Sequence, residues 1–147
     1  MENIVIIGGG NQAHYTIDII EKEGQYNIVG IIDSICDIGS ERFGYKILGR
    51  QENIVEIINQ YQIQGGLITI GDNWVRHIVS KQILELVPNF EFVNAIHPSV
   101  IIGNNVRIGF GVTAMAGVIF NPKSTIGNFT FLLLGSNRTR LYHIRFC

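Results

Sequence analysis

Glycine and acidic residues follow the first apolar segments of this 147-residue chain in an order that suits nucleotide binding. Gly8-Gly9-Gly10 ends the apolar run Ile4–Ile7, and Asp33 ends the apolar run 28–32. The pattern Gly8-x-Gly10-x-x-Ala13, with Asp33 about 20 residues later, fits a dinucleotide-binding fingerprint. Glycine lets the backbone approach a ligand, amides at a helix start favour phosphate oxygens, and a carboxylate at a strand end accepts hydrogen bonds from a ribose or base.

Alternating strand and helix patterns position these residues within the first 95 positions. Short β-branched runs predict strands, and apolar residues at helical spacing predict the helices between them. The predicted strands cover 4–7, 28–32, 66–70 and 90–93, and the predicted helices cover 12–23, 51–62 and 74–87. Strands that alternate with helices favour right-handed crossovers and a parallel sheet. The sequence therefore predicts a Rossmann-like α/β domain over residues 1–95.

A period of six residues replaces this alternation after residue 95. One apolar series recurs in steps of six from Ile96, and an apolar or small series recurs from Val100. The two series are Ile96, Ile102, Ile108, Ala114, Phe120, Ile126 and Leu132, and Val100, Val106, Val112, Val118, Ser124, Thr130 and Ser136. Short fixed periods mark β-helices, in which each hexad forms one face of a triangular coil. Consecutive hexads in phase disfavour the alternative of a β-sandwich with accidental spacing, so residues 96–137 are expected to form the first β-helix coils.

The hexad register breaks after Asn137. Arg138 would take an inward position and Tyr142 a corner position, and neither side chain fits a packed coil. Residues 138–147 are therefore interpreted as an out-of-register tail. Little more than two coils remain in register, whereas solenoids need about three or more stacked repeats for stability. We expect the β-helix to be incomplete.

Composition argues against several other classes of protein. Charged residues make up 16% of the chain and the net charge is −1, so no basic stripe supports nucleic-acid binding. The longest apolar runs, such as 131–134, are far shorter than the roughly 20 residues of a membrane span. Two cysteines, Cys36 and Cys147, imply no disulfide framework and no metal site. The first residues show no basic, cleavable leader pattern, and a cytoplasmic protein is expected.

These features together resemble a known family of enzymes. The chain is similar to the sialic-acid O-acetyltransferase and UDP-N-acetylbacillosamine N-acetyltransferase family of hexapeptide-repeat, left-handed β-helix sugar acyltransferases. The matching segments are 6–13, 32–34, 70–73 with Arg76, 95–99 and the hexads up to residue 136. The resemblance implies an acetyl-CoA-dependent acetyltransferase that acts on a nucleotide-activated amino sugar or a sialic acid. It also implies a homotrimer in the full-length form, with CoA bound between neighbouring β-helices.

The resemblance also places the substrate contacts in this sequence. They fall on Gly10, Asn11, Gln12, Asp33, Ser34 and Gly71. Relatives often carry Ser or Gly, then Gly and His, where this chain has Gly10-Asn11-Gln12, so the sugar and the choice between N- and O-acetylation stay open. Arg76 either pairs with Asp72 across one helical turn or binds an anion.

The general-base histidine of the family is expected in an Ile-Glu-His-Asp-Cys-like segment soon after Ser136. The chain has Asn137–Cys147 there instead, so no catalytic residue is assigned. Back-translated with permitted codons and read from the second nucleotide, this stretch encodes I-E-H-D-C-I-I-S-D-F. We therefore expect that a frameshift near residues 131–136 created this C-terminus, and that the 147-residue chain is an inactive, truncated form. A genuine divergent C-terminus is the alternative.

Two other functions fit parts of the sequence. The glycine fingerprint with Asp33 also suits an NAD- or nucleotide-binding module. The hexads alone suit a non-catalytic trimerisation module. A dehydrogenase has no place for the hexads, and the α/β part lacks a second mononucleotide-binding half.

Overall fold

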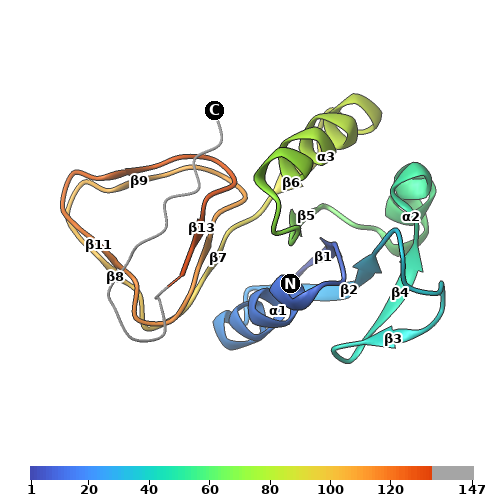
Figure 1. The fold of residues 1–147 in the computed structure, drawn as a ribbon, viewed down its shortest axis with the longest axis horizontal. Helices are drawn as coiled ribbons and strands as arrows, with labels where there is room; N and C mark the ends of the chain where they lie inside the picture. Colours follow the sequence, from blue (N-terminus) through green and yellow to red (C-terminus); the bar gives the residue numbers. More distant parts are fainter. Residues whose placement is uncertain (134–147) are drawn as a thin grey trace.

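The computed structural model describes residues 1–133. Figure 1 shows an α/β unit beside a triangular coil. The α/β unit contains β1 (Glu2–Ile7), α1 (Asn11–Glu23), β2 (Tyr26–Ile32), β3 (Glu41–Arg42), β4 (Tyr45–Gly49), the 3-10 turn η1 (Gln51–Asn53), α2 (Ile54–Tyr61), β5 (Gly65–Ile68), α3 (Asn73–Leu86) and β6 (Glu91–Phe92). Each predicted strand and helix of this unit is present, with boundaries that differ by at most three residues, whereas β3 and β4 are additional strands.

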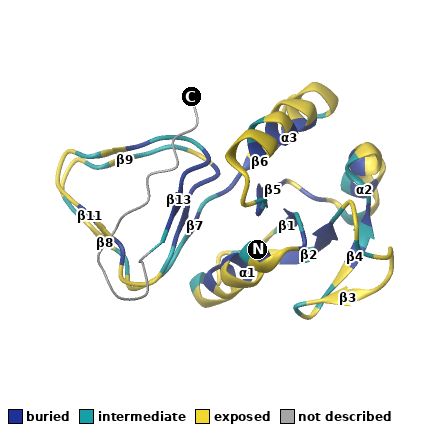
Figure 2. Cartoon of the chain, viewed as in Figure 1, coloured by how far each residue is buried: buried dark blue, intermediate teal, exposed yellow. Residues whose placement is uncertain are grey.

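One sheet with the strand order β3-β4-β2-β1-β5-β6 forms the centre of the α/β unit. Its pairings are parallel except that of β3 with β4. Alternate residues of β1 face opposite layers, as the period of two in a strand requires. Ile4 and Ile6 pack in one cluster with Ile17 of α1, whereas Val5 packs in another with Ile83 of α3. Figure 2 shows the sheet buried between helices that expose their outer faces. The predicted Rossmann-like unit is confirmed, and its sheet is parallel as predicted except for the antiparallel pair β3–β4.

The β3–β4 hairpin was not predicted from the sequence. Its turn consists of Phe43 and Gly44, whose φ angles of 53° and 84° are both positive. Positive φ at both central residues is the pattern of a two-residue type I′ turn. Strand β3 could not be predicted, because its residues Glu41 and Arg42 are both charged and exposed and show no apolar alternation. The hairpin matters for function because it extends the sheet beyond β2 and carries arginines to the edge of the site.

Short parallel strands form the triangular coil (Figure 1). They are β7 (Ala95–Ile96), β8 (Ile101–Ile102), β9 (Arg107–Ile108), β10 (Thr113–Ala114), β11 (Ile119–Phe120), β12 (Thr125–Ile126) and β13 (Phe131–Leu132). Each pairs with the strand 18 residues away, as in Ile102 with Phe120. Three hexads therefore make one coil. The residues with positive φ in the connections are also six apart: Asn105, Gly111, Gly117, Lys123 and Phe129.

In the series that starts at Ile96, full burial begins with the second turn of the coil. Ala114, Phe120, Ile126 and Leu132 are at most 4% exposed, whereas Ile102 is 51% exposed. The second coil stacks on the first, whereas no other coil within residues 1–133 lies beneath the first. The predicted tail at 138–147, with Ser136 just before it, lies outside the described residues.

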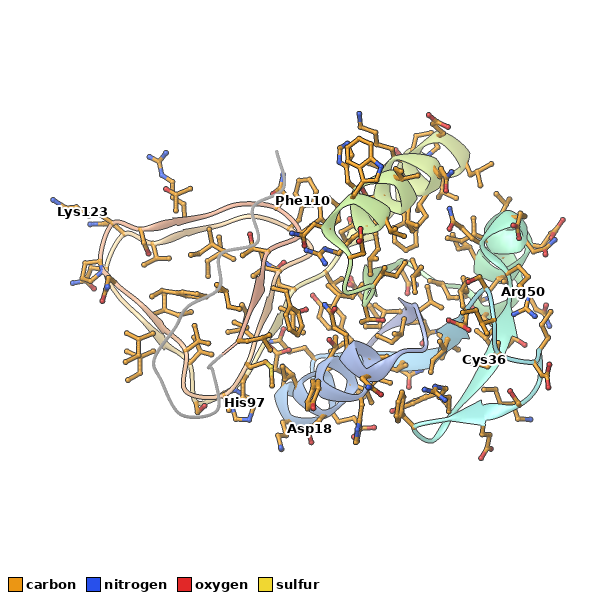
Figure 3. All side chains as sticks on the ribbon, in the orientation of Figure 1. Asp18, Cys36, Arg50, His97, Phe110 and Lys123 are labelled. Atoms are coloured by element: carbon orange, nitrogen blue, oxygen red, sulfur yellow. The ribbon has the colours of Figure 1, made fainter. Side chains whose placement is uncertain are left out.

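Aromatic rings join the coil to the α/β unit. Phe92 of β6 meets Phe129 of the coil at a ring-centroid distance of 4.9 Å, and Phe129 meets Phe110 at 5.4 Å. Figure 3 shows Phe110 at the coil corner that faces α3. The coil is thereby fixed against the end of the sheet that carries β5 and β6.

Candidate functional site

A cavity of about 380 Å³ lies at the carboxyl ends of the parallel strands. It is lined by Ile7, Gly8, Gly9, Gly10, Ile32, Asp33, Ser34, Ile35, Arg50, Gln51, Glu52, Ile70, Gly71, Val75 and Val79. In open α/β sheets, this edge is where ligands bind. The floor is apolar and the rim is polar, which is the usual composition of a small-molecule site.

Four of the six predicted substrate contacts line this one cavity. Gly10, Asp33, Ser34 and Gly71 come from three different strand ends and meet there. Asn11 and Gln12 do not line the cavity; they form the start of α1 directly beside it. Gln12 Oε1 lies 3.5 Å from the point where a Cβ on Gly71 would be, so Gln12 borders the cavity next to Gly71.

The glycine turn after β1 is held by its neighbouring strands. The Gly8 amide donates to the Ile32 carbonyl at 2.8 Å, and the Thr69 hydroxyl donates to the Gly8 carbonyl at 2.5 Å. Gly8 has a φ of 110°, and a Cβ there would meet Ile70 and Thr69. A side chain at Gly8 is therefore excluded by both conformation and space.

Three amides at the start of α1 remain open to a ligand. Among residues 1–133, the N–H groups of Gly10, Asn11 and Gln12 have no hydrogen-bond acceptor. No side chain caps α1, and its first turn contains no acidic residue. A helix start of this kind carries partial positive charge and unsatisfied donors, both of which favour a phosphate.

Asp33 organises the loop after β2. Its Oδ1 accepts the Gly9 amide at 2.9 Å, and its Oδ2 accepts the amides of Ile35 and Cys36 at 3.0 and 2.7 Å. Partial burial acts to raise the pKa of Asp33, but hydrogen bonds from Cys36, Gly9 and Ile35 outweigh it and lower the pKa to about 2. The carboxylate is therefore ionised at neutral pH, and most of its acceptor capacity is used within the protein.

Two arginines of the hairpin region brace the same corner. The Arg42 Nε donates to the Gly9 carbonyl, and the Arg42 guanidinium lies 5.0 Å from the centroid of the Phe43 ring. Arg50 Nη1 donates to the carbonyls of Asp33 and Cys36 at 2.7 and 2.6 Å. Figure 3 shows Arg50 and Cys36 on the side of the α/β unit away from the coil. Sequence reasoning missed both arginines because it missed the hairpin.

Arg76 supports the turn after β5. Its side chain is only 2% exposed, and Nη1 donates to the Ile70 carbonyl at 2.7 Å. Asp72 caps α3 by accepting the Val75 amide at 2.9 Å. Burial lowers the pKa of Arg76, against the opposing effect of the Asp72 charge. The guanidinium thus donates hydrogen bonds to backbone carbonyls of the turn that lines the cavity, and Arg76 itself does not line the cavity.

Histidines and metal ligands contribute little to this cavity within the described range. His97 Nδ1 accepts the Ser99 amide at 3.0 Å at the start of the coil, and the His14 ring stacks on Phe43 at 4.8 Å. Among residues 1–133, no histidine lines the cavity and no group of His, Cys, Asp and Glu is arranged to hold a metal ion. Within the same range, each helix is too short or too polar to cross a membrane.

The fold and the cavity define a Rossmann-like α/β protein whose candidate site is built at the carboxyl ends of the strands around a glycine turn. Residues 3–83, more than half of the chain, match the PglD N-terminal domain family, and the chain belongs to that family. The family predicted from the sequence is thereby confirmed. A comparison with curated protein sequences gave no match.

Solved structures of similar fold agree with this assignment. A mutant of perosamine N-acetyltransferase from Caulobacter crescentus, in complex with CoA and GDP-perosamine, is 30% identical, with a TM-score of 0.78 over 89% of this chain and 60% of that one. A second mutant of this enzyme, with the same ligands and identity, gives a TM-score of 0.80 over 92% and 61%. The acetyltransferase domain of PglB from Neisseria gonorrhoeae shares the fold at 18% identity, with a TM-score of 0.66 over 90% and 65%. The chain thus spans about 60% of the length of the perosamine enzyme.

Proposed function

We propose that this chain supplies the sugar-nucleotide-binding part of an acetyl-CoA-dependent sugar acetyltransferase. The observation that carries the proposal is the cavity at the strand ends, bordered by the three open amides of Gly10, Asn11 and Gln12. Support comes from the Caulobacter crescentus enzyme, which is 30% identical and binds GDP-perosamine and CoA.

We assign residues 1–95 to the sugar-nucleotide-binding domain and residues 96–137 to the opening coils of a left-handed, hexapeptide-repeat β-helix. The parallel pairing of strands 18 residues apart supports the second assignment. Acetyl-CoA binding and trimer formation belong to the β-helix in this proposal. The exposed, paired residues Ile101 and Ile119 on one face of the coil suit a subunit interface.

The cavity orients its ligand in this proposal. The diphosphate lies on the amides of Gly10, Asn11 and Gln12, and the ribose lies beside Asp33 and Ser34. Gly71 allows the sugar to approach the backbone. The coil adjoins the β5–β6 side of the sheet (Figure 1), so the sugar end of the ligand points toward the coil. An acceptor amine or hydroxyl there would attack the thioester carbonyl of acetyl-CoA while a general base takes its proton. We place that base outside residues 1–133.

Thermal unfolding tests the proposal directly. The 147-residue chain should unfold about 5 °C or more higher with a nucleotide sugar at roughly 100 times its Kd, because only the native state binds the ligand. NAD should give no such shift. Stabilisation by NAD alone would contradict the proposal and favour the NAD-binding alternative. A trimer that binds no nucleotide would favour the assembly module.

A variant locates the binding site. Gly10→Asp should abolish the shift, because the new carboxylate repels the diphosphate. The fold should survive, since a Cβ at Gly10 meets no atom within 4 Å and Asp is a favoured N-cap residue. Gln25→Glu adds the same charge near the other end of α1 and should keep the shift. Equal nucleotide-sugar binding by both variants would show that the glycine turn is not part of the binding site.

A further inference from the structure

The end of the cavity beyond β2 carries polar groups that a diphosphate on the α1 amides does not use. Arg50 and Glu52 follow β4 and line the cavity with Ile35. β4 is the second strand from β1 in the sheet. Its end lies about 10 Å from the glycine turn, at a strand spacing of about 4.8 Å. A nucleotide with its ribose beside Asp33 therefore extends its base toward Arg50 and Glu52.

Unlike Asp33, the two side chains at this end keep most of their hydrogen-bonding groups unpaired. Arg50 Nη1 is engaged by the carbonyls of Asp33 and Cys36, which fixes the guanidinium. Its Nη2 and Nε have no partner among residues 1–133. Glu52 is exposed, and within the same range its carboxylate forms neither a hydrogen bond nor an ion pair. The lining at the base end of the cavity thus includes both the free carboxylate of Glu52 and the positioned guanidinium of Arg50.

We propose that Glu52 and Arg50 recognise guanine, so that the ligand of this cavity is a GDP-linked sugar; this rests on the proposed function above. Guanine has two adjacent donors, N1–H and the exocyclic N2 amine, and the two oxygens of a carboxylate accept such a pair. Arginine donates to guanine O6 and N7. Uracil places one N–H between two carbonyl oxygens, which a carboxylate repels. Adenine offers a single amine beside an unprotonated ring nitrogen.

Calorimetric titration with three nucleotides tests this recognition. GDP, inosine diphosphate and UDP are titrated into the full 147-residue chain, its Glu52→Gln variant and its Glu85→Gln variant. Inosine diphosphate lacks only the exocyclic amine of GDP. Glu85 is the matched control, because it is an exposed residue of α3 that does not line the cavity.

The wild-type chain and Glu85→Gln should bind GDP about tenfold or more tighter than inosine diphosphate and UDP. Glu52→Gln should bind GDP and inosine diphosphate with similar affinities. Equal wild-type affinities for GDP and UDP would overturn guanine recognition and leave the proposed function standing. A GDP preference that survives in Glu52→Gln would overturn the role of Glu52. Binding of none of the three nucleotides would overturn the proposed function itself.

Discussion

At the scale of single residues, the role of Asp33 differs from the one that the fingerprint implies. The fingerprint uses a carboxylate at this position to accept hydrogen bonds from a ribose. In this structure three backbone amides already donate to it, from Gly9, Ile35 and Cys36. Asp33 therefore ties the glycine turn to the loop after β2, and the ribose can use only the acceptor capacity that remains on Oδ1.

Asp33→Asn should destabilise the protein at pH 7 by roughly 1 to 2 kcal/mol, because the amide nitrogen of Asn would face backbone donors. The folded pKa of about 2 lies below the ordinary value of 3.8, so the stabilisation is present above about pH 4 and is lost as the pH falls toward 2. Urea denaturation of both proteins between pH 2.5 and pH 7 measures the difference.

The exposed Asp37 in the same loop provides the control. Asp37→Asn should leave the free energy of unfolding within about 0.5 kcal/mol of wild type at every pH. A gap between Asp33→Asn and wild type that stays constant down to pH 2.5 would argue against an ionised, hydrogen-bonded Asp33.

At the scale of elements, stacking decides which members of the hexad series stabilise the coil. Ile102 of β8 and Phe120 of β11 are paired and occupy the same position of the repeat. Phe120 is 3% exposed and Ile102 is 51% exposed. The repeat pattern predicts that both side chains are buried equally, but of the two only Phe120 is buried inside the coil.

Phe120→Ala should therefore cost about 3 to 5 kcal/mol, as expected for a large side chain removed from a packed core. Ile102→Ala should cost less than about 1 kcal/mol, because the native side chain is already half in water. Amide hydrogen exchange across residues 95–133 measures both effects. Equal loss of protection in the two variants would show that the underside of the first coil is covered in solution.

At the scale of the whole molecule, the α/β unit and the coil share packing. Phe92 of β6 and Phe129 of the coil are in edge-to-face contact, and Phe129 belongs to the same buried cluster as Val79 of α3. The boundary proposed at residues 95 and 96 thus separates two architectures that do not pack independently. This contact gives the coil one orientation relative to the cavity, as the acyl transfer that we propose between them would require.

The coding DNA should contain the remainder of the enzyme in a shifted reading frame. If the tail arose by a frameshift near residues 131–136, the shifted frame reads I-E-H-D-C and continues with further hexads. Restoring the frame should yield acetyl-CoA-dependent turnover of a nucleotide sugar, whereas the 147-residue chain should show none, because in this hypothesis the segment that supplies the general base is out of frame. DNA with no hexads in the shifted frame, or turnover by the 147-residue chain, would contradict the frameshift.

Much of the architecture could be predicted from the sequence because it depends on local periodicity. The β-branched run before Gly8 and the helical spacing that follows specify a strand and a helix through burial alone. The six-residue period likewise specifies strands that pair 18 residues apart, since each turn of the coil repeats the same apolar positions. The family followed from the order of these motifs along the chain.

The tertiary structure decided what depends on residues far apart in sequence. Strand β3 has no apolar pattern, since Glu41 and Arg42 are both exposed, and the short alternation in β4 is buried in the sheet because β4 pairs with β2. That pairing brings Arg42 to the glycine turn and Arg50 to Asp33. Predictions from spacing could place Gly10, Asp33 and Gly71 at strand ends, since strand ends are local features. They could not show which hydrogen-bond donors and acceptors are already paired within the protein. That pairing depends on which loops lie next to each other, and the order of the strands in the sheet decides this.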